Sequence, residues 1–371
     1  MIYFDNAATT LRKPISVYEA VNEAMQTCAS VGRSGHTAAR RAAELTFACR
    51  QVAGDMFHVL PDQVVFTLNA THSLNIAIFS LISPGDKVVV SGFEHNAVLR
   101  PLHHLGAELI VAGRSLFRPE QTVDAFRSAL ENKPKAVVCT HVSNVFGYVL
   151  PLEEIAALCR ERGVPLIVDA AQSAGVLPLS LKELGASFIA MPGHKALYGP
   201  QGTGMLLCSK SPKPILYGGT GSQSQSREMP RELPDLAEPG THNVPGIAGL
   251  KAGMEWLSQQ GTNAIQKQEA HLIGILQNGF RKLDHIRGFY GDPCCQTGVF
   301  SFTVDTMDCE VVSQRLSDAG IAVRAGLHCA PLAHESAGTL QCGTVRVSVS
   351  AFNSEAEAEV FLATLQKILN A

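Results

Sequence analysis

The sequence contains no long hydrophobic segment, and its charges nearly balance. The longest apolar candidate, Leu74 to Ile82, is far below the roughly 18 residues of a membrane-spanning helix and contains Asn75 and Ser80. The net charge of −3, from 30 Lys and Arg against 33 Asp and Glu, leaves no basic field for nucleic acid or anionic lipid. The opening residues, MIYFDNAATTLRKP, lack the apolar core of a signal peptide. We therefore expect a cytoplasmic protein that binds neither membranes nor nucleic acid.

The ten cysteines are too few for a dense disulfide scaffold in 371 residues, and no two have C-x-x-C spacing. Several lie in apolar runs, among them Cys139, Cys159 and Cys208, as buried reduced thiols do. With 46% apolar and 17% charged residues, the chain is not of the disordered class. These properties indicate a globular enzyme or small-molecule binder.

Between about residues 50 and 210, short apolar segments alternate with amphipathic patterns, which predicts an α/β fold. We expect seven strands, within residues 64–68, 87–93, 107–112, 136–144, 165–171, 187–193 and 204–209. Helical patterns lie between several of them, at residues 74–81, 95–106, 122–132 and 151–163. Strands joined by crossover helices form a mostly parallel sheet covered on both faces, with ligands at the carboxyl ends of the strands.

Residues 217–240 are rich in Gly, Ser and Pro, which is typical of a solvated loop or of an arm that reaches a partner subunit. Two helices are predicted after it, over residues 246–260 and 262–283. The rest of the chain alternates again, with strand patterns at 298–305, 320–329 and 344–350 and helices at 310–319 and after Asn353. We expect a large domain of residues 13–257 and a smaller α+β domain of residues 1–12 and 258–371.

Two neighbouring strand ends carry opposite charges. Asp169 ends the strand of LIVDAAQSAG, and Lys195 follows the next strand in FIAMPGHKALYGPQGTG. A simple ion pair or a helix-capping Asp would explain the charges without any function. The surrounding glycines, however, allow a ligand to approach the backbone closely. A lysine that forms a Schiff base with pyridoxal phosphate (PLP), with a carboxylate on the pyridine nitrogen, requires these two charges side by side.

An anion site is expected upstream of these charges. In TLNATHSLN a strand passes into a helix, and Ala70, Thr71 and Ser73 place backbone N–H groups at the helix N-terminus. His95, directly after another strand, is either structural or stacks on a cofactor ring.

Eight segments together resemble the cysteine desulfurases and selenocysteine lyases, which are class V, fold-type I PLP enzymes. They occur in the family's order along nearly the whole chain: YFDNAATT, TLNATHSLN, EHNA, THVSNVFG, VDAAQSAG, GHKALYGPQGTG, EPGTHN and VRAGLHCA. The resemblance implies a fold-type I transferase fold with a mostly parallel seven-stranded sheet, and a homodimer.

The resemblance also implies roles for individual residues. Lys195 would be the Schiff-base lysine and Asp169 the pyridinium partner, with His95 stacked on the ring. The other cofactor-binding candidates are Ala70, Thr71, Asn144, Gln172, His194 and, from the second subunit, Thr241. The substrate-binding candidates are Asn144, Arg324, Arg346 and His36. The planar guanidinium of Arg346 suits a carboxylate.

Cys329, in RAGLHCAPLAH, decides the type of reaction. It is a buried structural thiol, a zinc ligand with His328, His334 and Cys342, or a nucleophile activated by nearby positive charge. The zinc spacing fits no common structural site, and we assign no metal. In the family, the matching cysteine takes the substrate sulfur as a persulfide. The compact segment resembles the subgroup that often needs a sulfur-accepting protein.

Two positions depart from the family pattern. Pro192 stands where a phosphate-binding Ser is usual, and Ala70 stands where a second hydroxyl is common. The sequence thus predicts a divergent cysteine desulfurase that converts L-cysteine to L-alanine. The alternatives are a selenocysteine lyase, another class V aminotransferase or lyase, and a non-catalytic PLP-binding regulator.

Overall fold

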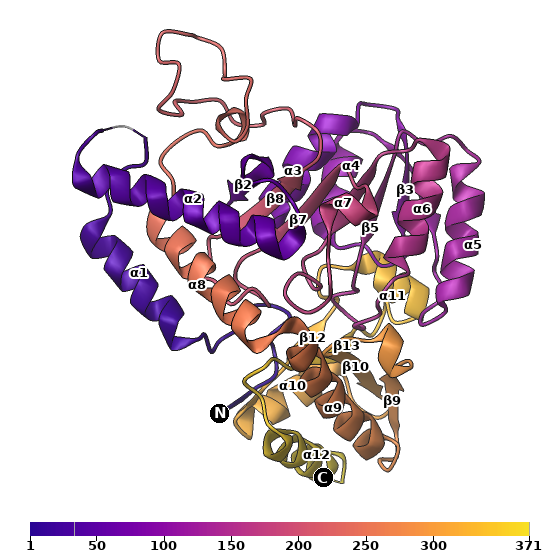
Figure 1. Ribbon diagram of the computed structural model, residues 1–371. Helices are drawn as coiled ribbons and strands as arrows, with labels where there is room; N and C mark the ends of the chain where they lie inside the picture. The colour runs from indigo at the N-terminus through magenta and orange to yellow at the C-terminus, as the bar shows by residue number, and fades with distance from the viewer. Residues whose placement is uncertain (33, 371) are drawn as a thin grey trace.

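A sheet of seven strands lies at the centre of the larger part of the molecule (Figure 1) in the computed structural model, which describes residues 1–32 and 34–370. Its order is β2-β8-β7-β6-β5-β3-β4. The strands are β2 (Val64–Thr67), β3 (Lys87–Ser91), β4 (Glu108–Ala112), β5 (Ala136–Thr140), β6 (Leu166–Asp169), β7 (Phe188–Pro192) and β8 (Gly204–Cys208). β8 runs antiparallel to both of its neighbours, β2 and β7, and the other pairings in the sheet are parallel. Each strand lies within a predicted range, so the mostly parallel seven-stranded sheet is confirmed.

Alternate residues of these strands face two separate layers of helices, because successive side chains of a strand point to opposite faces. Val89 packs in one core, and Val88 and Val90 pack in the other. The first face is covered by α2 (Thr37–Phe57), α5 (Pro119–Leu130), α6 (Leu152–Arg162), α7 (Leu181–Leu184) and α8 (Val244–Gln260). The second face is covered by α3 (Ala70–Leu81) and α4 (Asn96–His104). Burial on both faces explains the continuous apolar runs in the sequence.

Two long helices near the N-terminus were not predicted. They are α1 (Ile15–Thr27) and α2, and both pack beside α8 (Figure 1). The buried positions of α2 recur every three or four residues, at Ala39, Ala42, Thr46, Cys49, Ala53 and Phe57. The helical period is therefore present in the sequence. Most of the buried positions hold small residues, however, so the two faces of the helix differ little in hydrophobicity.

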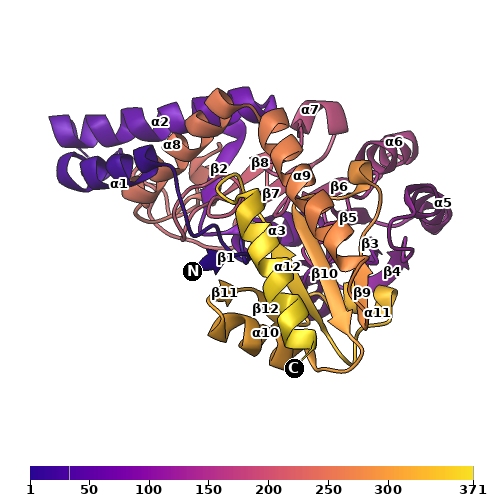
Figure 2. The same ribbon diagram turned by 90° about the horizontal axis from the view of Figure 1, so that it is seen from below.

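The C-terminal part contains an antiparallel sheet of four strands in the order β12-β13-β10-β9. They are β9 (Ile286–Phe289), β10 (Val299–Val304), β12 (Arg324–Gly326) and β13 (Thr344–Ser348). Helices α9 (Thr262–Phe280) and α12 (Glu355–Leu369) lie side by side across this sheet (Figure 2). The other helices of this part are α10 (Cys309–Asp318) and α11 (Pro331–Ala337).

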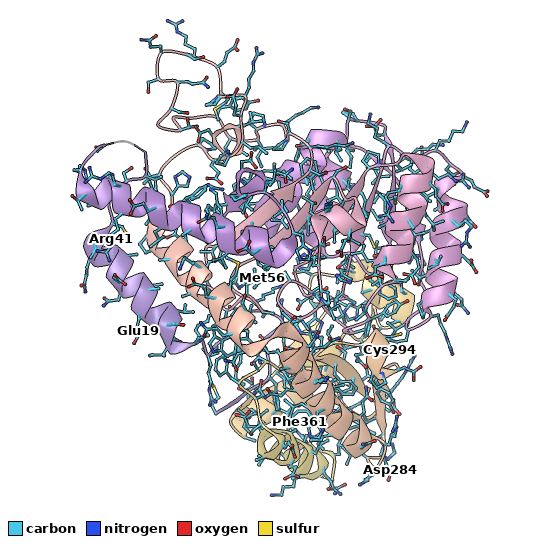
Figure 3. The ribbon with its side chains drawn as sticks, viewed as in Figure 1. Glu19, Arg41, Met56, Asp284, Cys294 and Phe361 are labelled. Carbon is cyan, nitrogen blue, oxygen red and sulfur yellow. The ribbon has the colours of Figure 1, made fainter. Side chains whose placement is uncertain are left out.

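This part has its own aromatic core, which includes Phe280, Phe300, Phe302 and Phe361; Phe361 is labelled in Figure 3. Phe4 belongs to the same core, and β1 (Ile2–Tyr3) pairs with β11 (Ile321–Ala322). The start of the chain therefore packs against its C-terminal part. The strand predictions were incomplete here: β1 and β9 were missed, and the single strand expected at 320–329 is divided into β11 and β12.

Residues 217–240 project from the body of the molecule as a long loop with mostly exposed side chains (Figure 1). Its one regular piece is a short helical turn, Asp235–Ala237. The ten cysteines are all free thiols, and Cys139, Cys159 and Cys208 are buried as expected. Over the residues that the structure describes, no helix is long and apolar enough to cross a membrane.

Candidate active site

A cavity of about 220 Å³ lies at the carboxyl ends of the central strands, where the sheet order predicts a ligand site. It is lined from both parts of the molecule. Ten of the residues singled out in the sequence line it together: Ala70, Thr71, His95, Asn144, Asp169, Gln172, His194, Lys195, Arg324 and Arg346.

Asp169 ends β6, and its side chain is 3% exposed. Its Oδ1 accepts a hydrogen bond from the backbone N–H of Ala171 at 2.9 Å. Burial raises the pKa of this carboxyl, while that hydrogen bond and the charge of Lys195 oppose the rise. Burying a carboxylate with so few partners is costly, and a cationic or N–H ligand in the cavity would offset this cost.

Lys195 follows β7 and lines the same cavity. Burial lowers the pKa of its amine to about 8, although Asp169 acts in the opposite direction. No ion pair joins Lys195 to Asp169 or to another acid in the described part of the chain. The structure therefore does not contain the simple ion pair that would have explained these charges without a function.

The N-terminus of α3 opens onto the cavity through Ala70 and Thr71. Asn69 caps the helix, with its Oδ1 accepting from the His72 N–H at 2.9 Å. The backbone N–H groups of the first turn and the positive end of the helix dipole suit an anion. Pro192 also lines the cavity and contributes no donor.

Two histidines line the cavity in the neutral form. Burial, followed by the charge of Lys195, lowers the pKa of both His95 and His194 to about 4. His95 caps α4, with its Nδ1 accepting from the Ala97 N–H at 3.0 Å. His194 Nδ1 lies 3.1 Å from Thr9 Oγ1. These contacts fix the orientation of both rings toward the cavity.

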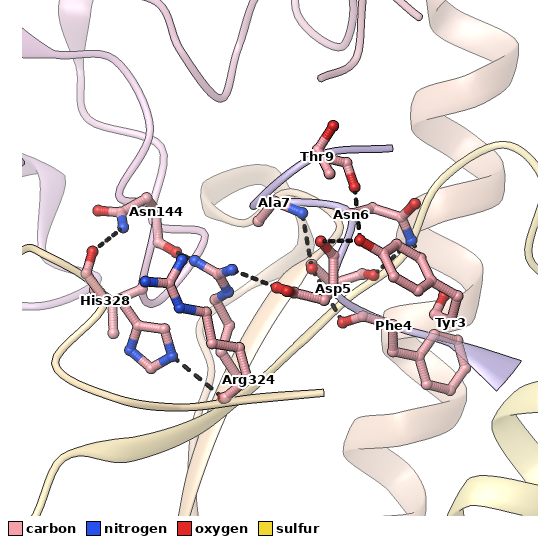
Figure 4. Close-up of polar contacts among 12 residues, drawn as sticks. Tyr3, Phe4, Asp5, Asn6, Ala7, Thr9, Asn144, Arg324 and His328 are labelled. Carbon is pink, nitrogen blue, oxygen red and sulfur yellow. Dashed lines mark hydrogen bonds and ion pairs between the residues drawn. The ribbon is translucent and has the colours of Figure 1, made fainter. Parts of the chain in front are cut away.

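Two arginines lie opposite each other on neighbouring strands, Arg324 on β12 and Arg346 on β13. Arg346 is 1% exposed; its Nη2 contacts Asp5 Oδ1 at 2.7 Å, and its Nη1 donates to the Asn144 carbonyl at 3.0 Å (Figure 4). Its Nε is buried without a hydrogen-bond partner. This donor and the guanidinium of Arg324 can receive a carboxylate in the cavity.

Cys329 is exposed and lies on the loop between β12 and α11. His328 and Cys329 have φ angles of 50° and 56°, in the left-handed region that costs energy for residues other than glycine. The Cys329 carbonyl accepts from the Asn96 N–H at 2.7 Å, and Asn144 Nδ2 donates to the His328 carbonyl at 2.9 Å. These bonds hold the loop against the cavity, which His328 lines and Cys329 does not.

Comparison with known proteins places the chain in a family. The profile of the aminotransferase class-V family matches residues 2–361. The chain is 32% identical to a probable cysteine desulfurase of Methanothermobacter thermautotrophicus, over 99% of this chain and 94% of that protein. It is 33% identical to a probable cysteine desulfurase of Pyrococcus abyssi, over 100% of this chain and 94% of that protein. The chain belongs to the cysteine desulfurase family.

Solved structures agree with this assignment. A cysteine desulfurase from Thermococcus onnurineus, in its apo form, superposes with a TM-score of 0.92 at 31% identity, covering 100% of this chain and 94% of that one. A cysteine desulfurase from Escherichia coli gives a TM-score of 0.86 at 26% identity, covering 99% and 94%. The expected fold-type I transferase fold of this family is therefore confirmed.

The zinc alternative at Cys329 finds no support in the geometry of this family member. His328 stacks on His334 with ring centroids 5.8 Å apart, and the Cys342 thiol donates to the backbone carbonyl of Thr339. Among residues 1–32 and 34–370, no group of three or more His, Cys, Asp or Glu side chains could hold a metal ion.

Besides Cys329, two candidate residues lie outside this cavity. His36 is an exposed residue that caps α2 through its Nδ1, which accepts from the Ala39 N–H at 3.3 Å. Thr241 is exposed and lines a different cavity, of about 330 Å³, at the base of the 217–240 loop. A role for either residue in a cofactor or substrate site stays a prediction.

Sequence reasoning missed two acidic residues near the site. Asp5 forms an ion pair with Arg346. The sequence analysis noted Asp5 only as part of the motif YFDNAATT. Glu94 is fully buried, and its Oε1 accepts from the Thr140 N–H at 2.7 Å and from Ser91 Oγ at 2.5 Å. Burial raises the pKa of Glu94 to about 8. Glu94, like His95, comes directly after a strand, and this position was the sequence signal that could have identified it.

Proposed function

We propose that this protein is a PLP-dependent cysteine desulfurase, which converts L-cysteine to L-alanine and carries the sulfur as a persulfide on Cys329. The observation that carries the proposal is that Lys195 and the buried Asp169 line one cavity, and that no ion pair holds either of them. Leaving both charges without a partner is costly, unless a ligand makes a bond to each.

The residues of the cavity fit PLP. The first turn of α3 would bind the phosphate, and its backbone N–H groups would replace the hydroxyls that Ala70 and Pro192 lack. Asp169 would contact the pyridine nitrogen, His95 would stack on the ring and Gln172 would bind the phenolic oxygen. Lys195 would hold the aldehyde carbon. When bound, PLP supplies an electron sink for the electron pair that remains at the substrate Cα.

Lys195 would act as the base that removes the Cα proton. With a pKa of about 8, about a tenth of the amine is neutral at pH 7, far more than for an ordinary lysine. Arg324 and Arg346 would hold the substrate carboxylate, with Asn144 beside them. This binding orients the Cα–H bond toward Lys195.

Cys329 would accept the sulfur. Its Sγ forms an S–S bond as the C–S bond of the substrate breaks, and the electron pair of the broken bond stays on the substrate Cβ. That carbon then takes a proton to become the methyl group of alanine. The exposure of Cys329 supports a second step, in which a sulfur-acceptor protein takes the outer sulfur from the persulfide.

The same proposal includes a homodimer, in which each chain has two domains. Thr241 of the partner subunit would complete the phosphate site, since Thr241 lies at the base of a projecting loop and outside the cavity of its own chain. The two separate cores support domains of residues 13–257 and of residues 1–12 with 258–371. Full activity of a dilute monomer would contradict the dimer.

Selenocysteine is a second candidate substrate. Cys329 does not line the cavity, and a selenol is a better leaving group than a thiol, so selenium could leave without an attacking thiol. Another class V transamination or a regulatory role is less well supported, because neither explains a thiol held beside the site.

The deciding experiment adds PLP and then L-cysteine to the purified protein. We expect a visible absorption band on addition of PLP, formation of alanine, and a Cys329-containing peptide that is heavier by one sulfur atom. A protein that binds no PLP would contradict the whole proposal. PLP binding without alanine formation would contradict the reaction.

A further inference from the structure

Cys294 and Cys295 are adjacent thiols that meet between β9 and β10. A hydrogen bond joins their Sγ atoms, which are 3.6 Å apart. Cys294 is exposed and is labelled in Figure 3, whereas Cys295 is half-buried and packs against the core of the larger part. Of the thiols in the described part of the chain, no other two form a hydrogen bond with each other. The molecule therefore presents one pair of sulfur atoms together, with access from solvent.

The backbone around this pair is held from both sides. Both cysteines belong to a short helical turn, Pro293–Cys295, in which the Cys295 N–H donates to the Asp292 carbonyl at 2.9 Å. The Cys295 carbonyl accepts from the Val149 N–H of the larger part, also at 2.9 Å. Successive side chains of a turn with three residues per turn point about 120° apart, so the contact of the two sulfurs does not follow from their being adjacent. A ligand that bridges both would need little further ordering of the chain.

The surroundings of the pair disfavour negative charge. Partial burial, a hydrogen bond from Cys294, and the charges of Cys294, Asp292 and Glu120 raise the pKa of the Cys295 thiol to about 11. Tyr148 is also close, and burial and, to a smaller degree, Cys295 raise the pKa of its phenol. The Cys295 thiol is thus protonated near neutral pH and is a weak nucleophile. A ligand whose complex with the two sulfurs is neutral fits these surroundings better than one whose complex is an anion.

The distance between the sulfurs limits the geometry of a bridging ligand. Bonds from zinc to thiolate sulfur are about 2.3 Å long. With bonds of this length, a linear centre such as Cu(I) would hold its sulfurs about 4.6 Å apart, and a pyramidal centre with angles of about 100° would hold them about 3.5 Å apart. The observed 3.6 Å matches the pyramidal centre.

Two ligands are too few for structural zinc, which needs four. Among residues 1–32 and 34–370, no third His, Cys, Asp or Glu completes a metal-binding group. Trivalent arsenic is a soft, pyramidal centre that bonds to two neighbouring thiols and keeps one oxygen ligand. Its complex with two thiolates and one hydroxyl is neutral, whereas the complex of Cu(I) with two thiolates is an anion.

We infer that Cys294 and Cys295 form a binding site for trivalent arsenic, taken up as arsenous acid. Each sulfur forms a bond to arsenic, each thiol proton leaves as water with one hydroxyl group of arsenous acid, and the third hydroxyl stays on the arsenic. One arsenous acid and two thiols thus give a neutral cyclic product and two waters, with no oxidation or reduction. Neither thiol lines the candidate active-site cavity, so this inference goes beyond the proposed function and does not depend on it.

The first test mixes the reduced full-length protein with sodium arsenite and removes the excess by gel filtration. Intact mass spectrometry should then show one adduct per chain, which is heavier by one arsenic and one oxygen atom and lighter by one hydrogen atom. A single thiol makes only one bond to arsenic, so the other cysteines should not retain an adduct. X-ray absorption at the arsenic edge should show two sulfur ligands and one oxygen ligand. Three sulfur ligands would contradict a site made of this pair alone.

Cys294→Ser and Cys295→Ser should each lose the adduct. The melting temperature of Cys294→Ser should stay unchanged, because the side chain is exposed, so its loss of binding would not be due to misfolding. Cys342→Ser is the matched control and should keep the adduct, since Cys342 is also exposed but its thiol donates to the Thr339 carbonyl. The inference is overturned by a wild type without an adduct, by an adduct that persists in Cys294→Ser, or by its loss in Cys342→Ser.

Arsenite binding and desulfurase turnover separate the two proposals. Normal turnover in a protein that retains no arsenic would refute this site alone. A protein that retains one arsenic per chain but binds no PLP would refute the proposed function and leave this site in place.

Discussion

Lys195 and Cys329 would both form covalent bonds in the proposed reaction, yet the molecule places them in opposite surroundings. The loop of Lys195 is tightly packed, because a Cβ on Gly193 would collide with Thr203 Oγ1. Cys329 is exposed and has a left-handed conformation. A base needs a dry cavity that lowers its proton affinity, whereas a thiol that passes sulfur to another protein needs access. In the proposed reaction, the base and the sulfur acceptor would therefore have different environments.

The largest expected effect is that of Lys195→Ala. The variant should show no visible band with PLP and no turnover, because both the covalent attachment and the base are removed. The melting temperature of the PLP-free protein should not fall, since a desolvated amine is removed. The matched control is Lys251→Ala, which breaks only the partly exposed ion pair with Glu255. Measurable turnover by the Lys195→Ala variant would contradict the proposed role of Lys195.

Cys329→Ser tests the proposed role of the exposed thiol. Release of sulfur from cysteine should be nearly abolished, by roughly 10²- to 10⁴-fold, while activity on selenocysteine survives in part. The melting temperature should stay unchanged, because an exposed side chain contributes little to packing. Turnover of both substrates and a melting curve measure this, with the exposed Cys342→Ser as control. Equal losses on both substrates would mean that Cys329 is not the sulfur-selective nucleophile.

Asp169→Ala should weaken PLP binding and reduce turnover, with an effect smaller than that of Lys195→Ala. The carboxylate that keeps the pyridine nitrogen protonated is lost, so the electron sink is weaker. Removing a buried, poorly paired carboxylate should at the same time stabilise the PLP-free protein. Titration with PLP and a melting curve separate the two effects. Full activity would show that another carboxylate has this role.

The smallest expected effect concerns pH and Glu94. Its pKa is about 8 in the folded protein against an ordinary value of 4.5, so the folded state binds this proton more tightly than the unfolded state. Its contribution to stability is complete below about pH 4.5 and is lost as the pH rises toward 8. The loss is on the order of a few kcal/mol. Glu94→Gln does not titrate there, so the PLP-free variant should gain stability relative to wild type between these pH values. A constant difference in the free energy of unfolding would show that Glu94 is ionised throughout.

Local sequence patterns were sufficient to predict the central sheet and the positions of Asp169 and Lys195 at its edge. All seven central strands were predicted within their ranges, because each is apolar on both faces and ends at a polar or glycine-rich turn. Asp169 and Lys195 could be placed at neighbouring strand ends for the same reason. The missed elements have weaker patterns: α2 buries mainly small residues, and β9 is half exposed and contains Arg287 and Gly288.

The sequence by itself determined the class of fold, the family and the order of the site motifs, because strand periodicity, turn residues and short motifs are local properties of the chain. Tertiary structure alone decided that Asp5 neutralises Arg346 across 341 positions. It also decided which thiol is exposed beside the site. Burial, hydrogen-bond pairing and proton affinity depend on residues far apart in the chain, and these become neighbours only when the two cores pack together.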